Sequence, residues 1–223
     1  MASDPILDIL NEKQREAVTS DAPQLLVLAG AGSGKTKVLV HRVAWCLETG
    51  LAIPRSILAV TFTNKAAAEM RSRIAGLTQF EVSSIWVGTF HSIAHRLLRL
   101  HWREAKLTER FQIIDSDDQL RLVKRVIKDL SLNDKEYPAK EVQWFINGCK
   151  DRGERPAHVD DYGDGSVRTM VKIYKAYEVS CERSGLVDFA ELLLRANELW
   201  INTPSLLEHY KTRFRHILVD EFQ

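Results

Sequence analysis

The chain has 223 residues, of which 45% are apolar, and its 31 basic and 30 acidic side chains leave a formal charge of +1. A chain of this length and composition can bury one or two hydrophobic cores, which excludes an intrinsically disordered protein. The balanced charge gives no overall attraction to polyanions, so any nucleic-acid surface must be a local patch.

Cysteine usage and the N-terminal sequence bear on the compartment. The three cysteines, Cys46, Cys149 and Cys181, are far apart in the sequence and form no C-x-x-C pair, a pattern that favours a reducing cytosol. The N-terminus has no basic segment followed by an apolar core, and no run reaches the roughly 18 apolar residues that span a bilayer. We therefore expect a soluble, cytoplasmic protein with no membrane partner.

The first predicted element is a short helix that opens at residues 11–14. Asn11 can cap this helix, and Gln14, three residues later, can close a capping box. The apolar run of residues 25–28 (LLVL) predicts a buried strand. A helix is expected over residues 37–47, ending at Gly50.

The segment between that strand and that helix, residues 29–36, reads AGAGSGKT. A strand that runs into a glycine-rich turn and a helix directs backbone N–H groups at one anion, so the segment predicts a phosphate-binding loop. Lys35 supplies a charge for the β- and γ-phosphates, and the Thr36 hydroxyl can ligate Mg²⁺. Ala29 replaces the first glycine of the general pattern, but the chain can still turn at Gly30, Gly32 and Gly34. A flexible linker is the alternative, disfavoured because linkers do not follow buried strands.

Further strands alternate with helices along the chain. Apolar runs at residues 57–62, 85–89 and 217–219 predict buried strands, with helices over 64–74 and 91–100. This alternation predicts an α/β fold with a parallel, doubly wound sheet. The last run delivers Asp220 and Glu221 to the carboxyl end of a strand, where such folds bind ligands. Beside the loop, Asp220 is a candidate Mg²⁺ ligand and Glu221 a candidate base for the attacking water.

Between about residues 91 and 214 the pattern changes to long amphipathic helices with few strand signals, which predicts a helical insertion. Ser116 and Gln119 are predicted to form a capping box at the start of one helix. An apolar stripe and a basic stripe then follow different faces of this helix. The apolar stripe is Leu120, Val123, Ile127 and Leu130, and the basic stripe is Arg121, Lys124, Arg125 and Lys128. Thr203 and Pro204 predict the start of the last helix.

Six segments together resemble the superfamily 1 DNA helicases of the UvrD, PcrA and Rep type. Residues 10–18 resemble the Q motif, and residues 29–36 resemble motif I, in which the family also carries alanine first. Residues 59–70 are similar to motif Ia and residues 87–91 to motif Ib. Residues 186–193 resemble a short motif before the final strand, and residues 219–223 resemble the start of motif II. The resemblance therefore extends from one end of the chain to the other.

This resemblance implies the architecture. It predicts a RecA-like P-loop NTPase lobe, made of residues 1–90 and 214–223, with an inserted all-α domain at residues 91–213. Because the chain stops at Gln223 within motif II, we expect the N-terminal portion of a helicase, without the second RecA-like lobe. Such a portion is expected to bind nucleotide weakly and to lack full activity.

The resemblance also implies a function, an ATP-dependent DNA helicase that moves 3′ to 5′ on single-stranded DNA and unwinds duplex. The implied cofactors are ATP and Mg²⁺, with Lys35, Asp220 and Glu221 as catalytic residues. The implied partners are single-stranded DNA, single-strand/duplex junctions and DNA-repair proteins in the nucleoid. The predicted nucleotide-binding residues are Gln14, Ala29, Gly30, Ala31, Gly32, Ser33, Gly34, Lys35, Thr36 and Lys37. The predicted DNA-binding residues are Phe62, Thr63, Asn64, Lys65, Thr89, Phe90 and His91.

Several of these residues have structural alternatives. Gln14 suits a capping box as well as an adenine contact, and Phe62 suits a strand core as well as a stacking platform for a base. The polar residues 63–65 can cap a helix or contact phosphate. His91 and His95 have the spacing of zinc ligands, but without the accompanying glutamate a metal role is disfavoured. The basic stripe is either a solvated helix face or a contact for duplex DNA.

Two other functions remain open on the residues alone. A different P-loop phosphotransferase, such as a nucleotide kinase, would use the inserted helices to bind a small acceptor. A non-catalytic protein-docking fragment would leave the nucleotide loop idle.

Overall fold

The computed structural model describes residues 5–30 and 32–222, and the chain forms two compact units. The first unit combines Met1–Ile93 with Ser205–Gln223, and the second is Ala94–Pro204. Across the part of the chain that the structure describes, no helix combines the length and apolar character needed to cross a membrane. The two units are described separately below.

The first unit contains a three-stranded sheet in the order β2-β1-β5. The strands are β1 (Ile57–Thr61), β2 (Trp86–Thr89) and β5 (His216–Val219). Both pairings are parallel, with Thr61 opposite Thr89 and Val60 opposite Val219. The prediction of an α/β fold with a parallel sheet is therefore confirmed, and the three strands end at one edge of the sheet.

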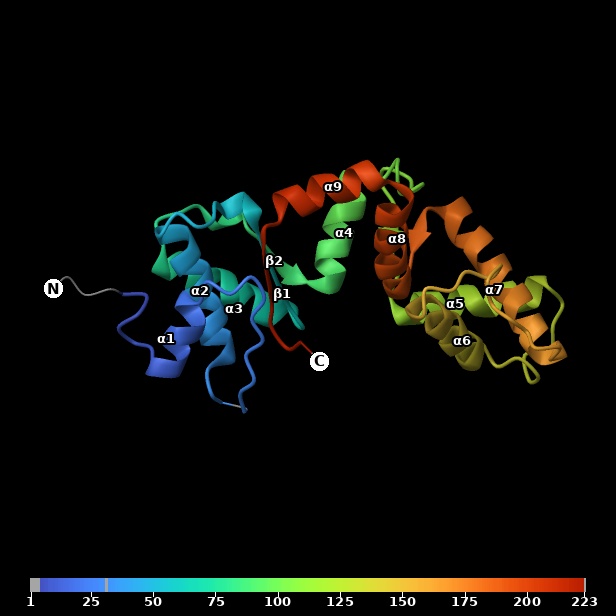
Figure 1. The fold of residues 1–223 in the computed structure, drawn as a ribbon. Coiled ribbons are helices and arrows are strands. Elements are labelled where there is room, and N and C mark those ends of the chain that lie inside the picture. Colours follow the sequence, from blue (N-terminus) through green and yellow to red (C-terminus); the bar gives the residue numbers. More distant parts are fainter. Residues whose placement is uncertain (1–4, 31, 223) are drawn as a thin grey trace. The chain divides into compact units, whose positions relative to one another are not determined.

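Helices accompany the sheet of the first unit (Figure 1). They are α1 (Glu12–Thr19), α2 (Lys35–Glu48), α3 (Asn64–Leu77), the start of α4 (Phe90–Leu100) and α9 (Pro204–Arg213). Short 3₁₀ turns at Pro54–Ser56 and Val82–Ser84 lead into β1 and β2. The core lies between α2, α3 and the sheet, where Val43, Met70 and Ile57 are fully buried. Packing of apolar helix faces against a sheet accounts for this layer.

Residues 25–28 do not form the predicted buried strand. They belong to no helix or strand, and their side chains are exposed, with Leu28 at 85%. An apolar run becomes a strand only where a neighbouring strand pairs with its backbone. Within the described residues the sheet ends at β5, where Ile217 also exposes 62% of its surface. The prediction was wrong for residues 25–28, and the burial predicted for residues 217–219 is only partial.

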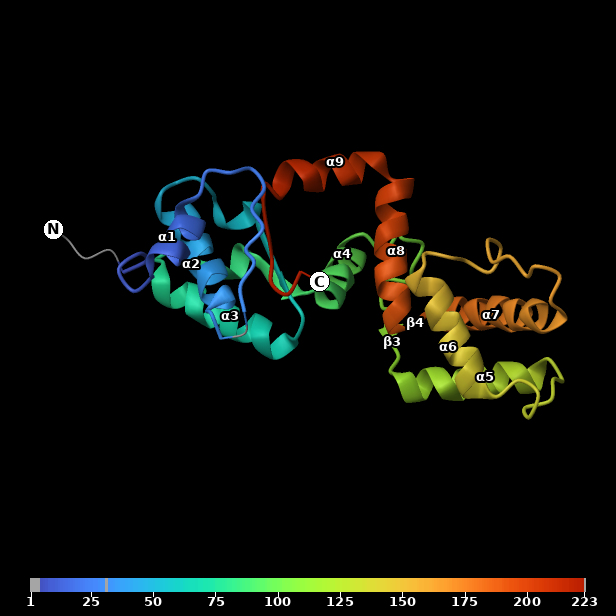
Figure 2. The same ribbon diagram turned by 60° about the horizontal axis from the view of Figure 1, so that its bottom comes forward.

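The second unit is mainly helical (Figure 2). It contains the rest of α4, α5 (Ser116–Asp129), α6 (Ala139–Asp151), α7 (Gly165–Ser184) and α8 (Phe189–Asn202). Its core includes Val123 and Ile127 of α5, as the apolar stripe predicted, together with Ile146 and Tyr174. One parallel pair, β3 (Gln112–Ile113) with β4 (Leu186–Val187), was not predicted, because two-residue strands leave no periodic pattern.

The start of α5 differs by one residue from the prediction. Asp115, and not Ser116, is the N-cap, since its side chain accepts from the Asp118 N–H. Aspartate and serine are comparably good caps, so neighbouring candidates cannot be ranked from sequence. Gln119 is buried instead of closing a capping box, and its amide nitrogen lies 2.7 Å from Asn147 Oδ1.

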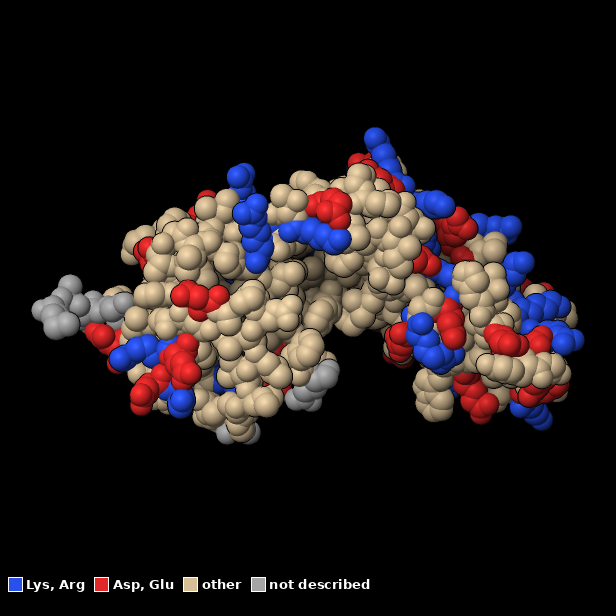
Figure 3. Space-filling view, viewed as in Figure 1, with Lys and Arg blue, Asp and Glu red and all other residues tan. Residues whose placement is uncertain are grey.

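The predicted basic stripe of α5 is exposed along its whole length. Arg121 pairs with Asp118 on the same helix. In Figure 3, basic and acidic side chains intermingle over the helical unit instead of forming a patch of one sign. The solvated-face alternative accounts for this surface without a ligand.

Candidate functional site

The phosphate-loop segment leads directly into α2, which begins at Lys35. Gly32 and Gly34 have φ values of +76° and +85°, which glycine adopts without steric cost. Gly34 is the N-cap of α2 and has no side chain that could accept a hydrogen bond from the first turn. The backbone N–H groups of that turn can therefore donate to an anion. The predicted nucleotide contact Ala31 lies outside the described residues.

Two side chains hold the loop in a compact turn. The Ser33 hydroxyl donates to the Gly30 carbonyl at 2.7 Å. The Lys35 ammonium donates to the carbonyls of Ala29 and Gly30 at 3.0 and 3.2 Å. These contacts hold the Lys35 ammonium against the backbone of the loop.

The beginning of α2 and the end of β5 meet at one point. The Thr36 hydroxyl donates to Asp220 Oδ2 at 3.1 Å, across 184 residues of sequence. Asp220 is buried, and its N–H donates to the Val60 carbonyl at 2.8 Å. A hydroxyl beside a carboxylate is a set of hard oxygen donors that fits Mg²⁺.

Glu221 follows at the carboxyl edge of the sheet and is exposed. Its φ of +58° lies in the left-handed region, which residues other than glycine seldom occupy. The two consecutive carboxylates differ in their surroundings, because Asp220 is buried beside the Thr36 hydroxyl whereas Glu221 is exposed.

Gln14 touches both its own helix and the phosphate loop. Asn11 caps α1 and forms the predicted capping box, in which Gln14 Oε1 accepts from the Asn11 N–H at 3.2 Å. Gln14 Nε2 also donates to the Ser33 carbonyl at 3.0 Å. The capping role is thus confirmed, and it leaves Gln14 next to the loop.

Lys37, the last of the predicted nucleotide residues, points elsewhere. Its ammonium donates to the Ile9 carbonyl at 2.6 Å, in the segment before α1. It lines a pocket of about 340 Å³ with Ile9, His41 and Arg73 among its walls. Burial lowers the pKa of His41, although its contact with the Ile6 carbonyl opposes that shift.

The predicted DNA-binding residues share one edge of the sheet. Because β1 and β2 are parallel with Thr61 opposite Thr89, residues 62–65 and 89–91 follow at the same carboxyl end. Phe62 is 81% exposed, so its predicted alternative as a core residue is wrong. Thr63 caps α3 by accepting from the Ala66 N–H at 3.1 Å, and Asn64 and Lys65 are exposed.

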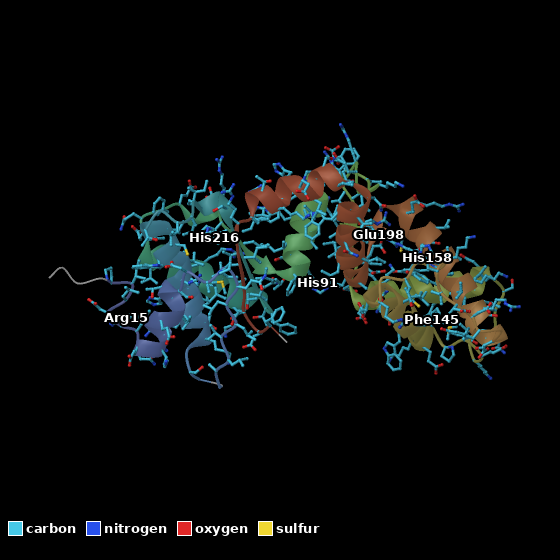
Figure 4. The ribbon with its side chains drawn as sticks, in the orientation of Figure 1. Arg15, His91, Phe145, His158, Glu198 and His216 are labelled. Atoms are coloured by element: carbon cyan, nitrogen blue, oxygen red, sulfur yellow. The ribbon has the colours of Figure 1, made fainter. Side chains whose placement is uncertain are left out.

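The second segment at this edge is more enclosed. Thr89 is buried, and its hydroxyl accepts from the Ser92 N–H at 3.1 Å. Phe90 is exposed, whereas His91, labelled in Figure 4, is half-buried at the start of α4. Among the described residues no cluster of three or more histidine, cysteine and carboxylate side chains is placed to hold a metal ion.

Comparison with known proteins agrees with this arrangement. Residues 10–223 match the family described as the UvrD/REP helicase N-terminal domain. The chain belongs to that family. It is 58% identical over 218 residues to DNA helicase II of Escherichia coli K12 and 53% identical over 222 residues to DNA helicase II of Haemophilus influenzae, with 98% of the chain covered each time.

A more distant relative also matches the chain. ATP-dependent DNA helicase PcrA of Leuconostoc citreum is 40% identical over 225 residues, which cover the whole chain. The chain spans about 30% of the length of each of these curated relatives. The recognition of a UvrD-type helicase is therefore confirmed.

The segment of residues 186–193 contributes Asp188 and Glu191 to a buried ionic cluster in the helical unit. Lys150 Nζ lies 2.7 Å from Asp188 Oδ2 and 2.9 Å from Glu191 Oε2, and its side chain is only 2% exposed. Tyr177 also donates to Asp188 at 2.7 Å. Arg155 pairs with Glu191, Glu178 and Glu198, the last labelled in Figure 4.

Electrostatic attraction outweighs burial in this cluster. Burial alone raises the pKa of Glu191, but the Lys150 ammonium and the Arg195 and Arg155 guanidinium groups lower it well below its usual range. Burial likewise opposes the charge of Lys150, yet Glu191 and Asp188 raise its pKa. Sequence reasoning missed the cluster, because isolated charged residues resemble solvated ones until their partners are known.

Proposed function

We propose that this chain forms the nucleotide-binding part of an ATP-dependent DNA helicase that moves on single-stranded DNA, in the 3′ to 5′ direction by resemblance, and unwinds duplex. The contact between Thr36 and Asp220 carries the proposal, because it joins the phosphate loop to a strand-end carboxylate 184 residues away. A phosphate loop with a carboxylate beside it is the arrangement that nucleoside-triphosphate hydrolysis needs.

ATP and Mg²⁺ are the proposed cofactors. Bound Mg²⁺ would neutralise charge on the β- and γ-phosphates. Thr36 and Asp220 would hold the ion, and Lys35 would turn from the loop carbonyls toward phosphate oxygens. Glu221 would orient the attacking water and take its proton. Gln14 would contact adenine beside Ser33, and the loop residues would contact the phosphates through their N–H groups.

Single-stranded DNA is the proposed substrate at the carboxyl edge of the sheet. Exposed Phe62 and Phe90 offer faces on which bases can stack, and Lys65 offers a phosphate contact. Thr63, Asn64, Thr89 and His91 would supply polar contacts around them. Strand-end contacts to DNA beside the nucleotide site would allow ATP turnover to change the grip on the strand.

The fold supports a proposed domain assignment. We assign the first unit, predicted as residues 1–90 and 214–223, to a RecA-like lobe and the second, predicted as residues 91–213, to an inserted helical domain. Residues 91–93 and 205–213, which include most of α9, belong to the first compact unit. The parallel sheet and the separate core of Ala94–Pro204 support this assignment. In the whole helicase we propose a second RecA-like lobe, single-strand/duplex junctions and DNA-repair proteins as partners, in the nucleoid.

Replacement of Lys35 tests the nucleotide site. Lys35→Ala should weaken Mg·ATP binding at least about tenfold, since it removes the charge at the phosphate loop. Equilibrium titration of fluorescent ATP into the full chain measures this, and Lys13→Ala, on exposed α1, is the control for the loss of one positive charge.

Three results would contradict the proposal. Equal affinity of the native and Lys35→Ala chains would favour a protein-docking role with an idle loop. Phosphate transfer to a nucleoside or nucleotide, without any response to DNA, would favour a nucleotide kinase. A full-rate, DNA-stimulated ATPase that survives Lys35→Ala would place the active site elsewhere.

A further inference from the structure

Side chains of α2 hold the segment that leads into α1, the helix that carries Gln14. Lys37 Nζ donates to the Ile9 carbonyl at 2.6 Å, and His41 Nδ1 lies 2.6 Å from the Ile6 carbonyl. Both contacts are to backbone oxygens of the approach to α1. The segment is thus bound through its main chain.

Arg42 of α2 makes the corresponding contact at the other end of α1. Its Nη1 lies 3.1, 3.0 and 3.0 Å from the carbonyl oxygens of Ala17, Val18 and Ser20. These carbonyls close the C-terminal end of α1, where carbonyls lack partners within a helix. The last turn of α1 contains no basic residue, so Arg42 supplies from α2 the positive charge that a helix C-terminus favours.

Apolar packing completes the contact between α1 and α2. Val18 is fully buried and clusters with Leu10 and Val38, with Ala17 and Trp45 against them. The Arg15 guanidinium, labelled in Figure 4, donates to the Leu7 carbonyl at 3.3 Å, in the segment before α1. The position of α1 is therefore set by its buried side and by Arg42.

We propose that Arg42 is a positioning residue for base recognition, because it fixes α1 on α2 and thereby holds Gln14 against the phosphate loop. The inference rests on the nucleotide site proposed above. Within the described residues, the contacts with Ser33 and Asn11 use one amide hydrogen and one oxygen lone pair of Gln14, so one of each can face a base while Gln14 stays anchored. Arg42 lies seven positions after Lys35 (42 − 35), about two helical turns away, and acts on the base through α1.

The test compares two ligands that share their phosphates. Mg·ATP and inorganic triphosphate are titrated into the native full chain and into Arg42→Gln. Arg42→Gln should weaken ATP binding about tenfold, the scale of charged hydrogen bonds lost at one site, and should change triphosphate binding less than about twofold. Lys13→Gln removes one positive charge from the exposed face of α1 and should leave both affinities within about twofold of native.

A double variant tests whether Arg42 acts through Gln14. If it does, Gln14→Ala and Arg42→Gln together should weaken ATP binding no more than the stronger single change. Arg42→Lys keeps a cationic donor and should restore part of the affinity. Amide exchange should accelerate in Glu12–Thr19 of Arg42→Gln and stay native in Lys35–Glu48, which separates undocking of α1 from unfolding.

Three results would overturn the positioning role. Arg42→Gln could weaken ATP binding and triphosphate binding equally, or leave ATP binding unchanged. The effects of Gln14→Ala and Arg42→Gln on ATP binding could also be additive in the double variant. Failure of the proposed function is recognised separately, because the native chain would then bind neither ligand. If Arg42→Gln does not fold, Arg42→Lys with the same two ligands decides the question.

Discussion

At the scale of single residues, the buried ions of the helical unit carry a large desolvation cost. Removing charges from water costs several kcal/mol per ion, which only close partners offset. The Lys150 ammonium lies within 2.9 Å of both Asp188 and Glu191, and Arg155 also pairs with Glu191. Loss of one member therefore leaves the others charged and buried.

Glu191 should make stability depend on pH. Its lowered pKa means that the ionised form contributes stability above the ordinary glutamate value of about 4.5, and this contribution is lost as pH falls toward the folded value. Glu191→Gln should cost about 3 kcal/mol at pH 7 and flatten the acid side of the profile. Urea unfolding followed by circular dichroism between pH 7 and pH 3 measures both effects.

The matched control for Glu191 is an exposed glutamate. Glu16 pairs with Lys13 on the surface of α1, and Glu16→Gln should change the free energy of unfolding by less than about 0.5 kcal/mol. A native acid profile in Glu191→Gln would show that the cluster does not set the pH response.

Residue-scale prediction from sequence succeeded where the signal was local. The capping box of Asn11 and Gln14 spans three positions and could be read directly. Lys150 gave no signal, because Asp188 is 38 residues away and only folding brings it close. Phe62 stayed ambiguous, since the end of a strand does not determine whether the next side chain enters the core.

At the scale of elements, the ends of helices and strands depend on what surrounds them. The C-terminus of α7 requires Gly185, whose φ is +63° and whose added Cβ would lie 2.9 Å from Thr108 Oγ1. The sequence alone could not show this crowding. Residues 25–28 failed as a strand for a related reason, because an apolar run does not reveal whether a pairing neighbour is present.

Two glycine substitutions should have opposite effects. Gly185→Ala should destabilise the helical unit by about 1–2 kcal/mol, because alanine resists the left-handed conformation and meets Thr108. Gly76→Ala, in α3 with open space around it, should stabilise the first unit by about 0.5–1 kcal/mol through lower chain entropy. Thermal unfolding of both variants measures the effects, and a shift of the same sign in both would contradict this account.

At the scale of the whole molecule, the balance of charge limits how DNA can be held. With a formal charge of +1, the chain offers no general attraction to DNA, so under the proposed function DNA would be held by local contacts, for which we propose the carboxyl edge of the sheet. The salt dependence of the DNA affinity then reports the number of phosphate contacts. The overall composition predicted this limit but could not show which residues share that edge, whereas the register of β1 and β2 does.

Single-stranded DNA should therefore bind with a log–log salt slope of about −0.7 per phosphate contact. Phe62→Ala should weaken binding by about 1–3 kcal/mol without changing that slope, because stacking involves no counterion release. Phe80→Ala, another partly exposed phenylalanine that follows α3, is the control. Fluorescence anisotropy at several salt concentrations distinguishes the cases, and a flat salt response or a slope changed by Phe62→Ala would refute this account.

The discontinuity of the first unit has a consequence for synthesis. The hydrogen bond between Thr36 and Asp220 can form only after the ribosome has added Asp220, 184 residues after Thr36. The strand β5 can join β1 only after the whole of Ala94–Pro204 has been made, and closure of so long a loop is slow. The helical unit is contiguous in sequence and can fold before β5 has been made. A nascent chain therefore carries the phosphate loop long before it has Asp220, the carboxylate that we propose holds Mg²⁺ beside that loop.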